Sequence, residues 1–225
     1  MKKFLNIFYF KNIINFIFSL SFYIFSLCLI VKLTFFSTFI YKISLNLFSI
    51  PLNSSFSKSQ ILSDYNEVIS YITNINNSFL NLKTFTLSDK ASYHFYEVKQ
   101  VFNSIDFFFI FFSLLILIYI LNLYKHKNLS IILNNISNFL LFSTLFLLTF
   151  CLFKFDLLFE FMHNIIFNNN YWLFNPEIDH IITIFPKEFF ILCFFFCLIL
   201  LLVIIISLKL LSKYISYQSK LCNKE

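Results

Sequence analysis

Four long apolar stretches, separated by polar segments, dominate the pattern of hydrophobic and polar positions along the chain. They cover about residues 12–40, 104–124, 130–153 and 189–211. A helix of roughly 20 apolar residues crosses the bilayer core, which is about 30 Å thick, so each stretch is long enough to span it. The pattern predicts an all-α, polytopic membrane bundle with four transmembrane helices, organised as a single membrane domain over residues 1–225.

The polar segment of about residues 44–103 also carries helical periodicity. Apolar residues recur at helical spacing from Tyr65 to Phe79, with polar residues between them. This arrangement predicts an amphipathic helix that lies on the membrane surface. Ser88 is a suitable N-cap for a second helix, which we expect to run into the second span.

The other long polar segment covers about residues 154–188. We expect the third span to continue past Lys154 as a helix until Pro176 breaks it. Trp172, the single tryptophan of the chain, suits the interfacial aromatic belt of a membrane protein. Both long polar segments are therefore predicted to be partly helical loops.

The distribution of lysine predicts the orientation in the membrane. Nine lysines fall on one predicted side of the spans, where Glu225 is the single acid, and the other ten acids fall on the opposite side. Cytoplasmic segments carry the excess of basic residues, so both termini and the short turn are expected in the cytoplasm and the two long loops outside. The nine lysines are Lys2, Lys3, Lys11, Lys125, Lys127, Lys209, Lys213, Lys220 and Lys224.

Composition narrows the class of function. Hydrophobic residues make up 59% of the 225 residues and charged residues only 12%, with a formal net charge of +6. The lysines flank apolar spans and form no aromatic-interleaved patch, so no nucleic-acid partner is expected. Glycine is absent, which excludes the glycine-rich phosphate loop and the glycine-flanked serine elbow of hydrolases. Lys32 and Asp106 lie near the ends of spans, where we expect their side chains to snorkel to the interface.

Three of the four histidines lie on the predicted outer side. His94 and His163 each lie where a predicted helix meets the membrane surface, His180 lies in the second loop, and His126 lies in the cytoplasmic turn. Because His94 and His163 come from different spans, they can converge above the bundle.

Each of these two histidines has a carboxylate at helical spacing on the same face. Glu97 follows His94 by three residues, and Glu160 precedes His163 by three. A carboxylate that accepts from one imidazole nitrogen fixes the tautomer and leaves the other nitrogen able to accept a proton. Either histidine is thus a candidate general base. Two other interpretations remain open: ordinary interfacial histidines, or a metal site with Asp179 as a further ligand.

Two sequence elements resemble the lipoprotein intramolecular transacylase Lit family of integral membrane proteins. The run from Ser88 to Lys99, with His94, resembles the family's H-x-x-D-V-K element, although Glu97 stands where that element has Asp. The second element covers 163–190: its histidine, tryptophan, proline and aspartate, and its Pro-x-x-Phe-Phe ending, occur in order at matching intervals. Asn170 stands where many relatives have an acid.

The resemblance implies a function as well as a fold. Lit-like enzymes move the sn-2 acyl chain of a diacylglyceryl-modified lipoprotein to the α-amino group of its N-terminal cysteine, which gives a lyso-form lipoprotein. It implies that His94 and His163 are the acid/base pair of an acyltransferase that needs no cofactor. The candidates for orienting the two histidines or stabilising the oxyanion are Glu97, Glu160, Asn169, Asn170, Trp172 and Asp179.

The partners implied are diacylated bacterial lipoproteins and membrane lipids, and the location is the bacterial cytoplasmic membrane with the active site facing outward. Two alternatives of another class remain: a non-catalytic membrane protein that binds lipids or lipoproteins, and an accessory subunit of a membrane complex.

Overall fold

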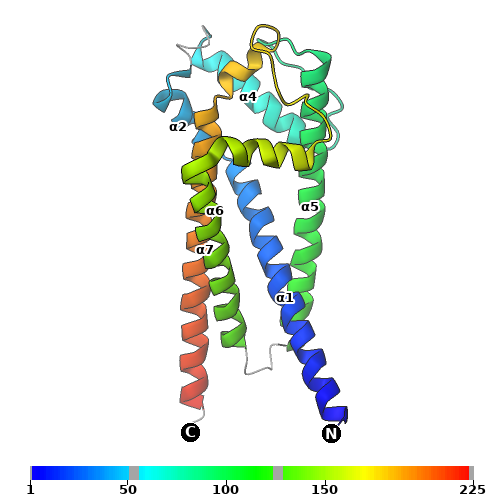
Figure 1. Cartoon of the computed structure of the whole chain (residues 1–225), viewed down its shortest axis with the longest axis vertical. Coiled ribbons are helices and arrows are strands. Elements are labelled where there is room, and N and C mark those ends of the chain that lie inside the picture. The colour runs from blue at the N-terminus through cyan, green and yellow to red at the C-terminus, as the bar shows by residue number, and fades with distance from the viewer. Residues whose placement is uncertain (1, 51–55, 124–128, 223–225) are drawn as a thin grey trace. The chain divides into compact units, whose positions relative to one another are not determined.

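Every regular element in the described residues 2–50, 56–123 and 129–222 of the computed structural model is helical. The predicted cytoplasmic turn with His126 lies outside these residues. The elements, shown in Figure 1, are α1 (Lys2–Phe35), α2 (Thr38–Leu47), α4 (Lys58–Thr73), α5 (Asp89–Leu123), α6 (Leu129–Ile166), the 3₁₀ helix η1 (His180–Ile184) and α7 (Lys187–Cys222).

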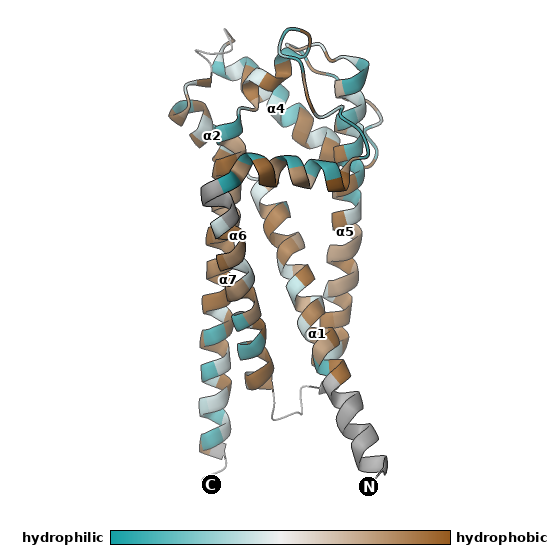
Figure 2. Ribbon diagram, viewed as in Figure 1, coloured by the Kyte–Doolittle hydropathy of each residue, from teal (hydrophilic) through white to brown (hydrophobic). Residues whose placement is uncertain are grey.

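Four of these helices are long and apolar enough to cross a membrane, which confirms the predicted fold class. Figure 2 shows hydrophobic residues along much of α1, α5, α6 and α7. The corresponding candidate spans are Ile13–Phe35, Asp89–Leu121, Leu129–Thr149 and Lys187–Leu221.

The chain forms two compact units. The first comprises Met1–Ile30, Phe107–Leu148 and Leu198–Glu225, and the second comprises Val31–Asp106 and Thr149–Cys197. In the first unit, the ring of Phe18 stacks on that of Tyr119 with their centroids 3.8 Å apart. The Tyr119 hydroxyl donates to Asn15 Oδ1 at 3.1 Å, so this buried polar group is satisfied within the unit.

The core of the second unit is built around α4, which corrects one prediction. Its apolar face is buried inside the protein and does not lie on a membrane surface: Tyr65 and Val68 are each 2% exposed. Tyr65 stacks on Tyr41 of α2 with centroids 3.7 Å apart, and the Tyr41 hydroxyl donates to the Ile184 carbonyl at 2.8 Å. Protein contacts supply the apolar environment that the amphipathic pattern requires.

The polar face of α4 also differs from the prediction. Asp64 is fully buried, and its carboxylate accepts from the backbone N–H groups of Lys83 and Thr84 at 3.0 and 2.8 Å. The helix ends at Thr73, so Phe79 lies beyond it and is exposed. Asp64 therefore ties the segment that leads to α5 onto α4.

Lys32 and Asp106 do not snorkel independently. They form an ion pair between α1 and α5 within the second unit, and both side chains are partly buried. Each charge thus has the opposite charge as a neighbour, which is the usual arrangement for ionisable groups near apolar segments.

The third long helix continues beyond Lys154, as predicted, but it is kinked there. Lys154 has non-helical backbone angles (φ −151°, ψ 46°) inside α6. The helix ends at Ile166, well before Pro176. Figure 1 shows the segment after Lys154 lying between the start of α7 and the first turns of α5, and Phe159 accordingly contacts Phe190 with centroids 5.4 Å apart.

Candidate active site

The first turn of α5 fixes the position of His94. Ser88 caps this helix as predicted: its Oγ accepts from the Ala91 N–H at 3.2 Å. Asp179 holds the cap in turn, accepting from the N–H and the hydroxyl of Ser88, both at 2.8 Å. Because Asp179 belongs to the loop after α6, the start of α5 is tied to that loop, and His94 lies within two turns of the tie.

The segment of α6 after the kink positions His163. Nδ1 of His163 is 2.7 Å from the Phe159 carbonyl oxygen. A carbonyl oxygen can only accept, so Nδ1 carries the proton and Nε2 has the free lone pair. The structure thus gives His163 a different orienting partner from the predicted Glu160, which is exposed.

The two imidazoles come close together, as the argument from topology anticipated. Their ring centroids are 6.0 Å apart, and each residue is only 8% exposed. Burial lowers the pKa of His163 below its usual 6.5, and the hydrogen bond to the Phe159 carbonyl opposes that shift. Two positive charges at this separation repel each other, so the pair disfavours holding two extra protons.

Glu97 is near His94 without forming a hydrogen bond to it. Glu97 Oε2 is 3.9 Å from His94 Nδ1, which is too long for a hydrogen bond. Its other oxygen, Oε1, accepts from the Asn169 side-chain amide at 2.7 Å. Asn169 Oδ1 accepts from the Tyr171 N–H at 2.9 Å. This chain of contacts fixes the loop after α6 against α5.

A mainly apolar cavity of about 590 Å³ lies beside the histidines, within the second unit. His94, His163 and Trp172 line it, together with aromatic and aliphatic side chains from α4, α5, α6 and α7. Aromatic rings flank the imidazoles: Phe174 lies 5.6 Å from His94 and Phe159 lies 4.1 Å from His163, between centroids. Such a site can hold an acyl chain next to two proton carriers.

Three buried polar atoms at this site have no hydrogen-bond partner: His94 Nδ1, Glu97 Oε2 and Trp172 Nε1. The Trp172 ring is 4.6 Å from His163, between centroids. A buried polar group without a partner costs free energy, and such groups are rare outside functional sites. The indole can only donate, so its N–H suits an acceptor brought by a ligand, such as an ester carbonyl oxygen.

The remaining predicted site residues do not line the cavity. Asn170 is exposed, as is His180, and Asp179 is buried in the cap of α5. Within the residues that the structure describes, no group of three or more His, Cys, Asp or Glu side chains is arranged to hold a metal ion. In particular, both carboxylate oxygens of Asp179 are occupied by Ser88.

The sequence analysis did not identify the Phe159 carbonyl or most of the aromatic residues that line the cavity. A backbone acceptor leaves no mark on residue identity, although its position four residues before His163 is the regular helical spacing. The chain has 37 phenylalanines, so those that line the cavity could not be distinguished from the rest by sequence.

The sequence profile of a family described as lipoprotein intramolecular transacylase Lit matches residues 16–190. No match was found among the curated proteins.

Among solved structures, the membrane-integral lipoprotein intramolecular transacylase Lit from Bacillus cereus is similar. It has a TM-score of 0.88 and 23% identity over 95% of this chain and 99% of that chain. A form of that protein with a histidine-to-arginine mutation has a TM-score of 0.85 and 22% identity over 98% of both chains. A form with a histidine-to-alanine mutation has a TM-score of 0.85 and 22% identity over 97% of this chain and 99% of that chain. At these identities the likeness shows a shared fold.

Proposed function

The chain belongs to the lipoprotein intramolecular transacylase Lit family, and from this premise we propose a specific reaction for it. It moves the sn-2 acyl chain of a diacylglyceryl-modified lipoprotein to the α-amino group of the N-terminal cysteine. The observation that carries the proposal is the His94–His163 pair, 6.0 Å apart between centroids, at an apolar cavity of about 590 Å³.

His163 is the general base of the proposed reaction. The α-amine has an ordinary pKa of about 7.7 to 8.0, so it is mainly protonated at neutral pH and cannot attack. The lowered pKa of His163 keeps its imidazole neutral there, with Nε2 free to accept the ammonium proton. His94, at 6.0 Å, serves as the second proton carrier.

The atoms balance without a covalent enzyme intermediate. The amine nitrogen forms a bond to the ester carbonyl carbon, and the bond from that carbon to the sn-2 oxygen breaks. One proton leaves the ammonium through His163, and a second passes from the nitrogen to the departing oxygen, which becomes a hydroxyl. Nucleophile and ester belong to one molecule. Aligning them in the cavity therefore lowers the activation free energy by several kcal/mol, as is general for tethered reactants.

Trp172 stabilises the negative charge that develops on the carbonyl oxygen. Trp172 lines the cavity, and its buried indole N–H has no hydrogen-bond partner among the residues that the structure describes. A donor held ready in a site of low polarity stabilises an oxyanion more than water does. Asn169 is a weaker candidate because its amide already donates to Glu97.

The proposed location is the bacterial cytoplasmic membrane, with both termini cytoplasmic and the cavity facing outward. The lysine distribution supports this orientation. Asn76, exposed in the segment after α4, offers a test. In a background without other cysteines, Asn76→Cys should react with a membrane-impermeant maleimide added to intact cells, and protection until the cells are lysed would refute the orientation.

The decisive test expresses the chain in a bacterium that makes only diacylated lipoproteins. Fragmentation mass spectrometry of an N-terminal lipopeptide should find one acyl chain on nitrogen, at unchanged total mass. His94→Gln and His163→Gln should abolish the transfer, whereas His180→Gln, an exposed histidine outside the cavity, should not. Lipoprotein that is bound but keeps both chains on oxygen would identify a non-catalytic binding protein.

A further inference from the structure

A second cavity, of about 410 Å³, lies in the first unit between the start of α6 and the end of α7. We call it the lysine cavity. It is lined by Ser130, Ile131, Asn134, Ser212, Lys213, Ser216, Tyr217 and Lys220. Hydroxyl groups, an amide and two ammonium groups make up its polar lining, and none of the lining residues is acidic.

Reciprocal hydrogen bonds hold the two helices together at this cavity. The Ser130 hydroxyl donates to the Ser212 carbonyl at 2.9 Å, and the Ser212 hydroxyl donates to the Ser130 carbonyl at 2.7 Å. Ser212 is buried, so this contact is protected from water. The contact between α6 and α7 at the cavity is therefore made by the protein's own hydrogen bonds and needs no ligand.

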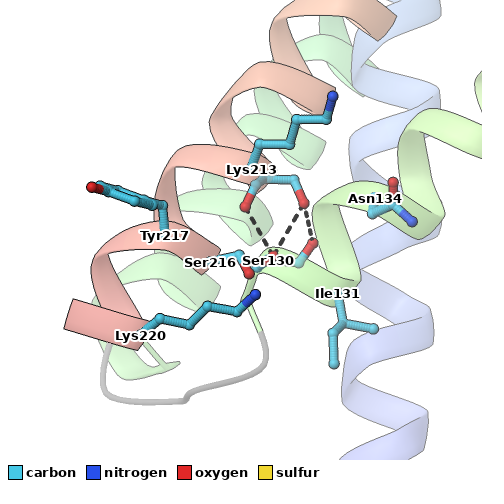
Figure 3. A pocket seen from close by; sticks show the side chains of 8 residues that line it. Ser130, Ile131, Asn134, Lys213, Ser216, Tyr217 and Lys220 are labelled. Atoms are coloured by element: carbon cyan, nitrogen blue, oxygen red, sulfur yellow. Dashed lines mark hydrogen bonds between the residues drawn. The ribbon is translucent and has the colours of Figure 1, made fainter. Parts of the chain in front are cut away.

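The two lysines lie on one face of α7. Lys213, Ser216 and Lys220 recur at spacings of three and four residues, which places them on the same side of a helix. In Figure 3 the side chains of Lys213 and Lys220 leave α7 on either side of Ser130. The ion pairs found among the described residues involve neither lysine.

Apolar surface adjoins this charged face. Ile131 of the lining is 61% exposed, and Leu210 and Tyr214 on α7 are 62% and 61% exposed. Exposed apolar side chains next to two ammonium groups match an amphiphile whose anionic head meets the lysines while its chains cover the apolar residues. A free inorganic anion would leave the apolar residues uncovered.

We propose that the lysine cavity binds the phosphate of an anionic phospholipid. Lys213 and Lys220 neutralise the headgroup charge, and Ser216 can donate a hydrogen bond to it. The lipid would bridge α6 and α7 within the first unit. The proposal does not depend on the acyl transfer reaction.

The test counts lipids bound to the full chain in detergent by native mass spectrometry, with phosphatidylglycerol as the probe and phosphatidylcholine, a zwitterion of zero net charge, as the comparison. Each of Lys213→Gln and Lys220→Gln should weaken phosphatidylglycerol binding about 5-fold, and the double variant roughly 30-fold, since one lysine near an anionic headgroup contributes on that order. Lys209→Gln, on the same helix but outside the lining, is the matched control and should change the affinity less than about 2-fold.

Circular dichroism of each variant establishes that the helices are retained. Equal weakening by Lys209→Gln would overturn the proposal, because it would mean diffuse attraction to a positive surface. So would phosphatidylcholine binding as tightly as phosphatidylglycerol. Displacement of the lipid by millimolar inorganic phosphate would assign the cavity to a free anion and overturn the lipid assignment.

Discussion

Trp172→Phe removes one N–H group from the histidine site and keeps an aromatic ring beside His163. Trp172 lines the cavity, and its indole N–H has no partner in the described part of the chain, so on the proposed mechanism its hydrogen bond is available to the reacting ester. Deleting one oxyanion donor typically lowers kcat by about 10² to 10³, or about 2.7 to 4 kcal/mol of transition-state stabilisation. We expect a loss in this range, with little change in KM.

Stability should hardly change. Breaking an intramolecular hydrogen bond costs about 1 kcal/mol of unfolding free energy, but Trp172 makes none through its side chain. The variant therefore loses only part of a ring that is partly buried, and its thermal midpoint should stay close to that of the wild type. Loss of activity without loss of stability is what separates a catalytic donor from a structural one.

The assay reconstitutes the protein in liposomes with a diacylated lipopeptide and follows the N-acylated product by fragmentation mass spectrometry. Phe174→Leu is the matched control, because it also replaces an aromatic side chain of the cavity lining with a smaller apolar one, at a ring 5.6 Å from His94, but removes no donor. It should lower kcat by less than about 10-fold. Wild-type kcat in Trp172→Phe, or a rise in KM alone, would refute the assignment of the indole N–H.

Four further predictions test the surroundings of the site. By NMR of histidine-labelled protein, the imidazole signal absent from His163→Ala should titrate with a midpoint below 6.5, because burial lowers that pKa; a midpoint above 6.5 would contradict it. The folded protein should also lose stability as the pH falls below 6.5, where the unfolded chain gains this proton first. Asp179→Ala should lower the thermal midpoint by an amount equivalent to about 3 kcal/mol, whereas Asp89→Ala, exposed in the first turn of α5, should cost under about 1 kcal/mol; equal effects would exclude the capping role. Lys99 is buried and donates to the carbonyls of Asn74, at 2.8 Å, and Asn77, so Lys99→Met should speed hydrogen exchange in the segment after α4, and Lys90→Met should not.

The four spans could be predicted because the membrane imposes a length and an apolar composition on each crossing, and both are visible in one dimension. The start of α5 could also be predicted, because the side chain of a serine such as Ser88 can accept a hydrogen bond from a free N–H group at a helix N-terminus. The partner of that cap, Asp179, lies 91 positions away in the chain. No local pattern could indicate that contact.

The surface role assigned to α4 failed for a related reason. An amphipathic pattern says that one face needs an apolar environment, and it does not say whether lipid or protein provides it. Here Tyr41, Ile184 and their neighbours provide it. The burial of Asp64 could not be predicted either. An aspartate on the polar face of a helix is expected to be solvated, and the two groups that bind it are backbone N–H groups, which every residue but proline has.

The sequence by itself determined the number of apolar crossings, the two histidines worth attention and the family elements around them. Only the tertiary structure decided that those imidazoles lie 6.0 Å apart, that a carbonyl and not Glu160 orients His163, and that the Trp172 N–H is left without a partner. The physical reason is that periodicity and composition record each residue's preference for water or apolar surroundings, whereas catalytic geometry depends on which distant segments pack together.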